Sequence, residues 1–266
     1  MISVDSMVDC VKSHRLYAHP MYDHWAETTP PVETTAALFH QVQKFCASTR
    51  PGLAFPPALR EMGWNQQADL IQEIVESESG HGAELATMAG HIVNRIAGEP
   101  YFSDVFDRNT VEPGLKEHSD RILGALPGYD PVKGLTAQAA AAISVFERRT
   151  ESERTTTIRN LGTSLALEII SNQSIIPGEK RALVDSGHYG VTMEEPEMHY
   201  LAEHWGECGA EQLHERNVIE AVGSVIDRQT APELEKGMTD FLESLSALWD
   251  VIDAALLKSG VDRVHG

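Results

Sequence analysis

The sequence has few cysteines, no long apolar run and a shortage of positive charge. Its 266 residues include Cys10, Cys46 and Cys208, which are too few and too scattered for a disulfide framework or a thiolate zinc site. No segment approaches the roughly 18 apolar residues of a membrane span, and the first residues lack the basic start and apolar core of a signal peptide. We therefore expect a soluble, cytoplasmic protein.

Lysine and arginine together number 21, against 40 aspartates and glutamates, so the formal net charge is −19. A field of this sign repels phosphate backbones and anionic membrane surfaces. Neither nucleic acid nor a membrane is an expected partner. With 42% hydrophobic residues the chain is long enough to bury a full core, and we expect one domain over residues 1–266.

Apolar positions recur every three or four residues, whereas the alternation typical of strands never lasts more than a few residues. This periodicity predicts an all-α protein. Prolines, glycines and capping residues delimit the expected elements. These are a stretch over 4–25 broken at His19-Pro20, and helices over 36–47, 66–97, 135–148, 159–176 (closed by Pro177-Gly178), 197–226 and 231–259. Residues 101–130 contain two prolines and several glycines, and we expect a connector or lid with a short helix over 115–123.

Carboxylates and histidines gather in the predicted 66–97 helix. At about 100° per residue, Glu78 and His81 share one helical face, as do His81 and Glu84, and Glu84 and His91 nearly eclipse each other. Such a face can present a carboxylate and an imidazole to one metal ion. The alternative is a solvated acidic helix with an incidental histidine.

Glu168 is an acid within an otherwise apolar stretch, LALEII. A carboxylate surrounded by apolar residues is costly to bury unless a cation or a metal accompanies it. Bridging a pair of metal ions would suit such a residue. Periodicity alone also allows it to face outward from a polar stripe.

A third set of candidate ligands lies in the predicted 197–226 helix. His204 and Glu211 are seven residues apart, and Glu211 and His214 are three apart, so all three can face one axis. Helical bundles build two-iron or two-manganese centres from Glu-x-x-His pairs and further carboxylates. Oxygen and nitrogen ligands without a thiolate favour iron or manganese over structural zinc.

Four segments together resemble the heme-oxygenase-like diiron oxidases: HPMYDHW (19–25), ESGHG (78–82), LALE (165–168) and the YLAEH…ExxH region (200–214). The likeness covers about residues 14–225, in short motifs. It implies a seven-helix bundle, here with extra short helices, related to thiaminase-type proteins and to the oxidase of pyrroloquinoline quinone synthesis.

The resemblance also implies a ligand set for two irons. Glu78 and His81 match the first pair, Glu168 the bridging glutamate, His204 the first histidine of the last core helix, and Glu211 with His214 the end of that motif. The last helix has His-x₆-Glu-x₂-His where the family has His-x₃-Asp-x₂-His. Glu207 or Cys208 could therefore replace a ligand there, and Glu84 with His91 fits a wider first pair.

By this resemblance we expect an iron-dependent oxygenase that uses O₂ on a small amine, amino acid or fatty acid. N-oxygenation, oxidative carbon–carbon cleavage and decarboxylation are the reactions implied. The resemblance also implies that one of the two irons is labile and that an external donor supplies electrons. Two alternatives stay open. One is a metal-free enzyme of this fold with His81, His204 and His214 as general bases, and the other is a non-enzymatic helical binding protein. The apolar last helix would suit a homodimer as well as a core.

Overall fold

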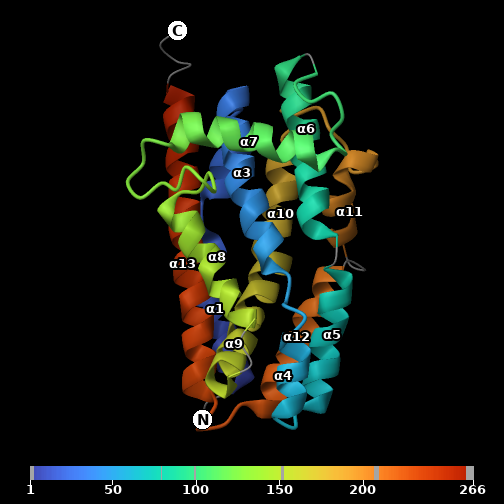
Figure 1. Ribbon diagram of the computed structural model, residues 1–266, viewed down its shortest axis with the longest axis vertical. Coiled ribbons are helices and arrows are strands. Elements are labelled where there is room, and N and C mark those ends of the chain that lie inside the picture. Colours follow the sequence, from blue (N-terminus) through green and yellow to red (C-terminus); the bar gives the residue numbers. More distant parts are fainter. Residues whose placement is uncertain (1–2, 79, 99, 151–152, 207–209, 262–266) are drawn as a thin grey trace.

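A computed structural model describes residues 3–78, 80–98, 100–150, 153–206 and 210–261, with only the backbone described at His81, Thr150, Gly260 and Val261. Every regular element in these ranges is helical, which confirms the all-α class (Figure 1). The α-helices are α1 (Val4–Ser13), α2 (Met21–Glu27), α3 (Val32–Thr49), α4 (Phe55–Glu61), α5 (Asn65–Ser77), α6 (His81–Ala97), α7 (Arg108–Leu123), α8 (Ala137–Glu147), α9 (Arg154–Ile170), α10 (Ile176–Glu179), α11 (His199–His204), α12 (Ala210–Val225) and α13 (Ala231–Val261). None of the described helices combines the length and the apolarity needed to span a bilayer.

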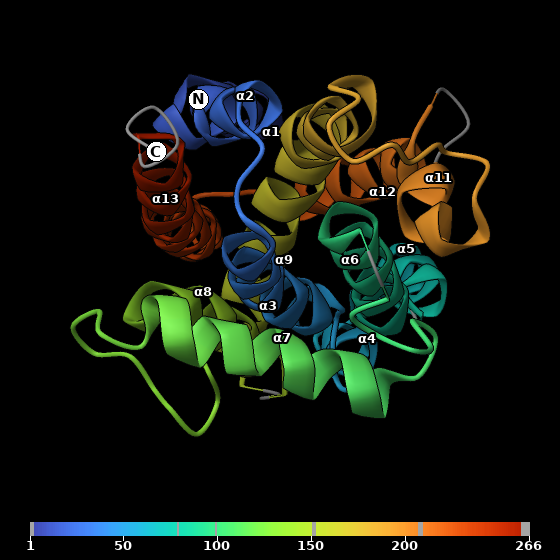
Figure 2. The same cartoon turned by 90° about the horizontal axis from the view of Figure 1, so that it is seen from above.

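The centre of the molecule is occupied by α3, which packs against α6, α7, α8 and α13 (Figure 2). Most of its residues between Thr34 and Cys46 are buried, including polar ones such as Gln41 and Gln43. A helix enclosed on most sides buries its polar side chains at a cost unless they find partners. Gln41 does so by donating to Ser119 and to the carbonyl of Gly134.

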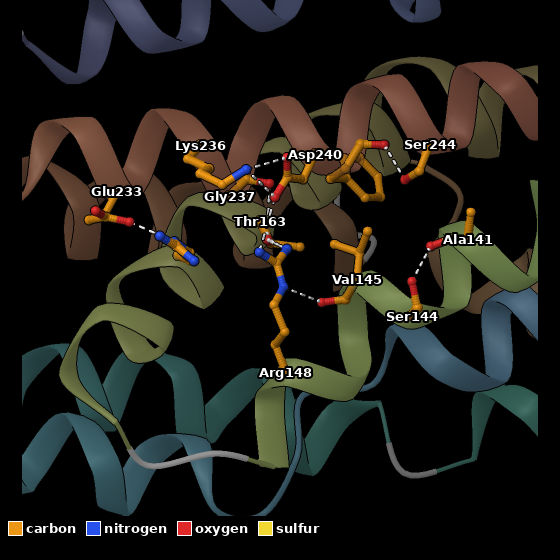
Figure 3. Close-up of polar contacts among 12 residues, drawn as sticks. Ala141, Ser144, Val145, Arg148, Thr163, Glu233, Lys236, Gly237, Asp240 and Ser244 are labelled. Atoms are coloured by element: carbon orange, nitrogen blue, oxygen red, sulfur yellow. Dashed lines mark hydrogen bonds and ion pairs between the residues drawn. The ribbon is translucent and has the colours of Figure 1, made fainter.

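The closest helix pair is α9 with α13, and two glycines make it possible. A Cβ at Gly162 would lie 2.0 Å from the carbonyl oxygen of Leu234, and one at Gly237 would lie 1.9 Å from that of Arg159. The hydroxyl of Thr163 donates to the carbonyl of Gly237 at 3.1 Å across this contact (Figure 3). The pairing fixes the height and rotation of α9, and with them the position of Glu168.

The helix that carries Glu168 continues beyond the predicted stop. After α9 the chain forms a π-helical turn (Ser171–Ile175), then α10, then a second π-helical segment (Lys180–Asp185). Pro177 is tolerated because it sits at the start of α10, and a Cβ on Gly178 would lie 2.4 Å from the ring of Tyr22. The prediction that Pro177-Gly178 closes the helix is therefore wrong: the glycine here serves close packing against α2.

Other predicted boundaries also shift. The expected 66–97 helix is divided into α5 and α6, and the expected 197–226 helix into α11 and α12, with Gly206 at φ +107° just after α11. Within the expected connector, α7 is 16 residues long and continues through Pro113 and Gly114. A Cβ on Gly114 would lie 2.5 Å from the Phe102 ring, so this glycine is required for packing and does not mark a helix end. The break at His19-Pro20 and the last helix are confirmed.

Candidate metal centre

Five of the six predicted ligands converge on one buried place. Glu78 follows the last residue of α5, Glu168 lies in α9, His204 ends α11, and Glu211 and His214 lie in the first half of α12. Each is at most 9% exposed. The side chain of the sixth, His81, lies outside the described part of the structure, and so do the alternatives Glu207 and Cys208.

The five side chains form two groups of potential ligands that share one carboxylate. Glu78, His204 and Glu211 make one group, and Glu168, Glu211 and His214 make the other, with the ligand atoms of each group within 4.8 Å of one another. Glu211 belongs to both groups. The geometry thus favours Glu211 as the residue between two metal positions, the place that the resemblance gives to Glu168.

The imidazole of His204 is oriented by a backbone carbonyl. His204 Nδ1 bonds the carbonyl oxygen of Tyr200 at 2.5 Å, and its Nε2 lies 3.6 Å from Glu211 Oε1. Because a carbonyl only accepts, Nδ1 carries a proton, and Nε2 is the ring nitrogen that faces Glu211. A backbone acceptor of this kind commonly fixes the tautomer of a metal-binding histidine.

Two ligand atoms in this cluster lack a hydrogen-bond partner although they are shielded from solvent, namely Glu211 Oε2 and His214 Nδ1. His214 Nδ1 lies within ion-pair distance of two carboxylates, 3.4 Å from Glu78 Oε1 and 3.7 Å from Glu168 Oε2. Buried polar atoms are usually satisfied, and leaving one unsatisfied costs about 1–3 kcal/mol. A bound cation would satisfy both atoms.

The electrostatics of the cluster are dominated by crowded carboxylates. Burial, followed by the nearby charges of Glu168 and Glu78, holds the pKa of Glu211 well above its ordinary value. Burial by itself would lower the pKa of His214, but its interactions with Glu78 and Glu168 outweigh that effect and raise it. In the absence of metal the cluster therefore retains protons that a metal would displace.

Arg149 is a buried cation whose charge interacts with the carboxylates of Glu168 and Glu78. Arg149 donates to the carbonyl of Thr49 and to the Ser164 hydroxyl, and its guanidinium lies over the Phe146 ring. Burial lowers the pKa of Arg149 to about 10, although the charges of Glu168 and Glu78 oppose the shift. If the cluster gave up its protons without taking up metal, this one fixed positive charge could not neutralise three carboxylates.

The divided helices explain how the ligands meet. Glu78 and His204 lie at helix ends, and Glu211 lies in the first turn of α12. The N-terminal end of a helix stabilises a negative charge, which offsets part of the cost of burying Glu211. The predicted eclipsing of His204 and Glu211 on one continuous helix is wrong, yet the two residues do come together.

The alternative first pair, Glu84 and His91, does not join these two groups. Glu84 falls with His199 and Glu203 in a more exposed group. His91 Nε2 contacts Glu195 Oε2 at 2.5 Å, and Arg95 donates to the same carboxylate. This interaction joins α6 to the segment before α11.

Several residues that surround the ligands were not predicted from the sequence. Ser171, in the first π-helical turn, hydrogen-bonds to Glu211 and lowers its pKa. Glu215, next to His214, accepts from the side-chain amides of Asn172 and Gln173. π-helical turns often occur at functional sites, but a sequence read as ending near Pro177 gives no signal for one.

A cavity of about 30 Å³ adjoins the cluster. Ser171 and Tyr200 line it, and these residues also contact Glu211 and His204. Glu179, Thr49 and Cys46 complete its polar lining, and apolar side chains that include Trp249 form the remaining wall. The sequence does not predict a role for Glu179, because this residue follows Pro177-Gly178, where the sequence predicts the end of the helix.

Comparison with known proteins adds nothing to this geometry, because no protein-family model matches the sequence and a search of curated proteins finds no match. The function must therefore be argued from the residues of the site itself.

Proposed function

We propose that this protein is an O₂-activating non-heme oxygenase that holds two iron ions among α5, α9, α11 and α12. We further propose that its helices form a heme-oxygenase-like bundle and that its substrate is a small amine, amino acid or fatty acid. The single observation that carries the proposal is the pair of buried ligand groups that share Glu211. One structural cation would not need the second group.

The donor set fits divalent iron. Three carboxylates and two imidazoles provide only oxygen and nitrogen ligands, as in the carboxylate-bridged centres of helical bundles. Once metal binding has displaced the protons of Glu211 and His214, the charge of Arg149 is too small to balance the three carboxylates in this buried place. Two divalent ions would offset the negative excess and would give Glu211 Oε2 and His214 Nδ1 a direct partner.

When bound, the two irons would supply the electrons and the coordination positions needed to activate O₂. The residues of the chain hold the ligand atoms in place and exclude water. The carbonyl of Tyr200 holds the His204 ring with Nε2 facing Glu211, and Ser171 orients Glu211. Because the pKa of Glu211 is raised, metal binding must release its proton, so iron uptake is expected to acidify the solution.

The decisive experiment is anaerobic titration of the metal-free protein with ferrous iron, followed by a pulse of O₂ observed by absorbance and Mössbauer spectroscopy. We expect uptake of about two irons per chain and an O₂-dependent optical change. Glu220→Gln is the matched control, because Glu220 is an exposed carboxylate on α12 whose partner is Gln66. Absence of iron uptake in wild-type protein would overturn the proposal and would favour a metal-free enzyme of this fold.

A further inference from the structure

The small cavity beside the cluster contains a carboxyl group that the metal centre does not use. Glu179 is 4% exposed, and its Oε2 has no hydrogen-bond partner. Its other oxygen, Oε1, accepts from the Tyr22 hydroxyl at 3.4 Å, which is a long hydrogen bond. A buried carboxyl with so little support is costly to the folded chain, and such groups are typical of functional sites.

The ionisable groups that line this cavity can carry only negative charge. Glu179 is its acidic member, and no lysine, arginine or histidine is among the described residues that line it. The carboxylates of the metal-ligand cluster add to the negative field, since the charge of Glu179 also contributes to the raised pKa of Glu211. An anionic group would be repelled here, whereas a cation would gain a partner.

The shape of the cavity limits what enters it. A volume of about 30 Å³ is room for two or three atoms the size of water, so the cavity can take only the end of a ligand. Apolar side chains, among them Phe45, Leu167 and Trp249, form the wall around Glu179. The ligand group that fits this cavity is a single cationic group attached to an aliphatic carbon.

We propose that Glu179 binds the primary ammonium group of the substrate, so that this cavity selects small aliphatic amines over alcohols and carboxylic acids. The inference rests on the proposed function, because it places the amine beside the two irons. The shared walls support that placement. Ser171 and Tyr200 face both the cavity and the ligands, so an amine held by Glu179 presents its nitrogen and adjacent carbon toward the cluster.

Binding would be accompanied by proton exchange. Burial raises the pKa of Glu179 to about 8, against a smaller lowering by the Tyr22 hydroxyl. At pH 7 the Glu179 carboxyl is thus mostly protonated. When an ammonium ion binds, the O–H bond of Glu179 breaks and its proton goes to solvent. The resulting carboxylate then accepts a hydrogen bond from an N–H of the ligand. The other titratable groups that face this carboxyl are Tyr22, Cys46, Tyr200 and Glu211.

The test uses metal-free, full-length protein, so that failure of iron binding and failure of amine binding are separate results. Propylamine, 1-propanol and propionate are titrated at pH 7 by ligand-observed NMR, and proton release is followed with a pH indicator. We expect propylamine to bind at least about tenfold more tightly than either analogue, with release of about one proton per amine. A tenfold difference in affinity corresponds to about 1.4 kcal/mol of binding free energy.

Glu179→Gln keeps the size of the side chain and removes its charge, and it is expected to abolish both the preference for the amine and the proton release. Glu235→Gln, which removes an exposed carboxylate on α13, should leave both unchanged. Equal binding of 1-propanol and propylamine to wild-type protein would overturn the proposal, as would tighter binding of propionate. Because these comparisons use wild-type protein, they hold even if Glu179→Gln fails to fold.

Discussion

His204 Nε2 lies 3.6 Å from Glu211 Oε1, although the two residues belong to different helices. Both side chains are almost fully buried, and Glu211 also belongs to the second ligand group with Glu168 and His214. The contact between α11 and α12 therefore connects the two proposed metal positions through one carboxylate. The consequences of that arrangement can be measured.

Removing the charge of Glu211, the shared carboxylate, should abolish binding of both irons, whereas removing the charge of Glu168 should abolish binding of one. Glu211→Gln is expected to retain little iron after desalting, and Glu168→Gln about one iron per chain, because the group of Glu78, His204 and Glu211 stays intact. Iron per chain is measured by elemental analysis, with Glu220→Gln as the control. Equal iron content in the two ligand variants would contradict the shared role of Glu211.

Loss of the Ser171 hydroxyl should move iron uptake to higher pH. The hydrogen bond from Ser171 lowers the pKa of Glu211, so Ser171→Ala raises that pKa further, and metal must then compete with a more tightly held proton. The measurement is iron binding across a pH series. Ser174→Ala, in the same π-helical turn, is the control. An unchanged pH profile in Ser171→Ala would show that the hydroxyl does not act on Glu211.

The metal-free protein should become less stable as pH rises from 4.5 to about 8, in part because of Glu179. Its carboxyl stays protonated in the folded state while the unfolded chain ionises, so the unfolded state binds fewer protons and the free energy of unfolding falls. The slope contributed by one such group is at most about 1.4 kcal/mol per pH unit. Urea denaturation at several pH values should show a shallower fall for Glu179→Gln than for wild type. Parallel curves would refute a raised pKa at this position.

Gly237→Ala should destabilise the fold by separating α13 from α9. The new Cβ would lie 1.9 Å from the carbonyl oxygen of Arg159, which cannot move without its helix. We expect a loss of about 3 kcal/mol in the free energy of unfolding, at the upper end of overpacking costs. In Gly223→Ala the nearest atom to the new Cβ is a methyl of Val4 at 3.3 Å, so its effect should stay below about 1 kcal/mol. Similar midpoints for the two variants in urea denaturation would contradict this account.

The sequence predicted the class of fold and most of the candidate ligands for one reason: both are local properties. Apolar spacing identifies helices, and an acid such as Glu168 in an apolar helix stands out without any knowledge of its neighbours. Helix ends were less predictable, because Gly114 and Gly178 serve close contacts with Phe102 and Tyr22 that lie far away in the chain. A glycine required for packing has the same sequence signal as one that ends a helix.

The sequence by itself determined that the chain is helical, acidic and furnished with glutamate and histidine at spacings suited to metal binding. Only the tertiary structure decided that Glu211 belongs to two ligand groups, that Glu84 and His91 lie outside them, and that Glu179 faces a cavity beside the cluster. The physical reason is that ligand geometry depends on how separate helices pack. Contacts such as that between Gly162 and Leu234 set this packing. Helical periodicity along the chain does not predict which helices make such contacts.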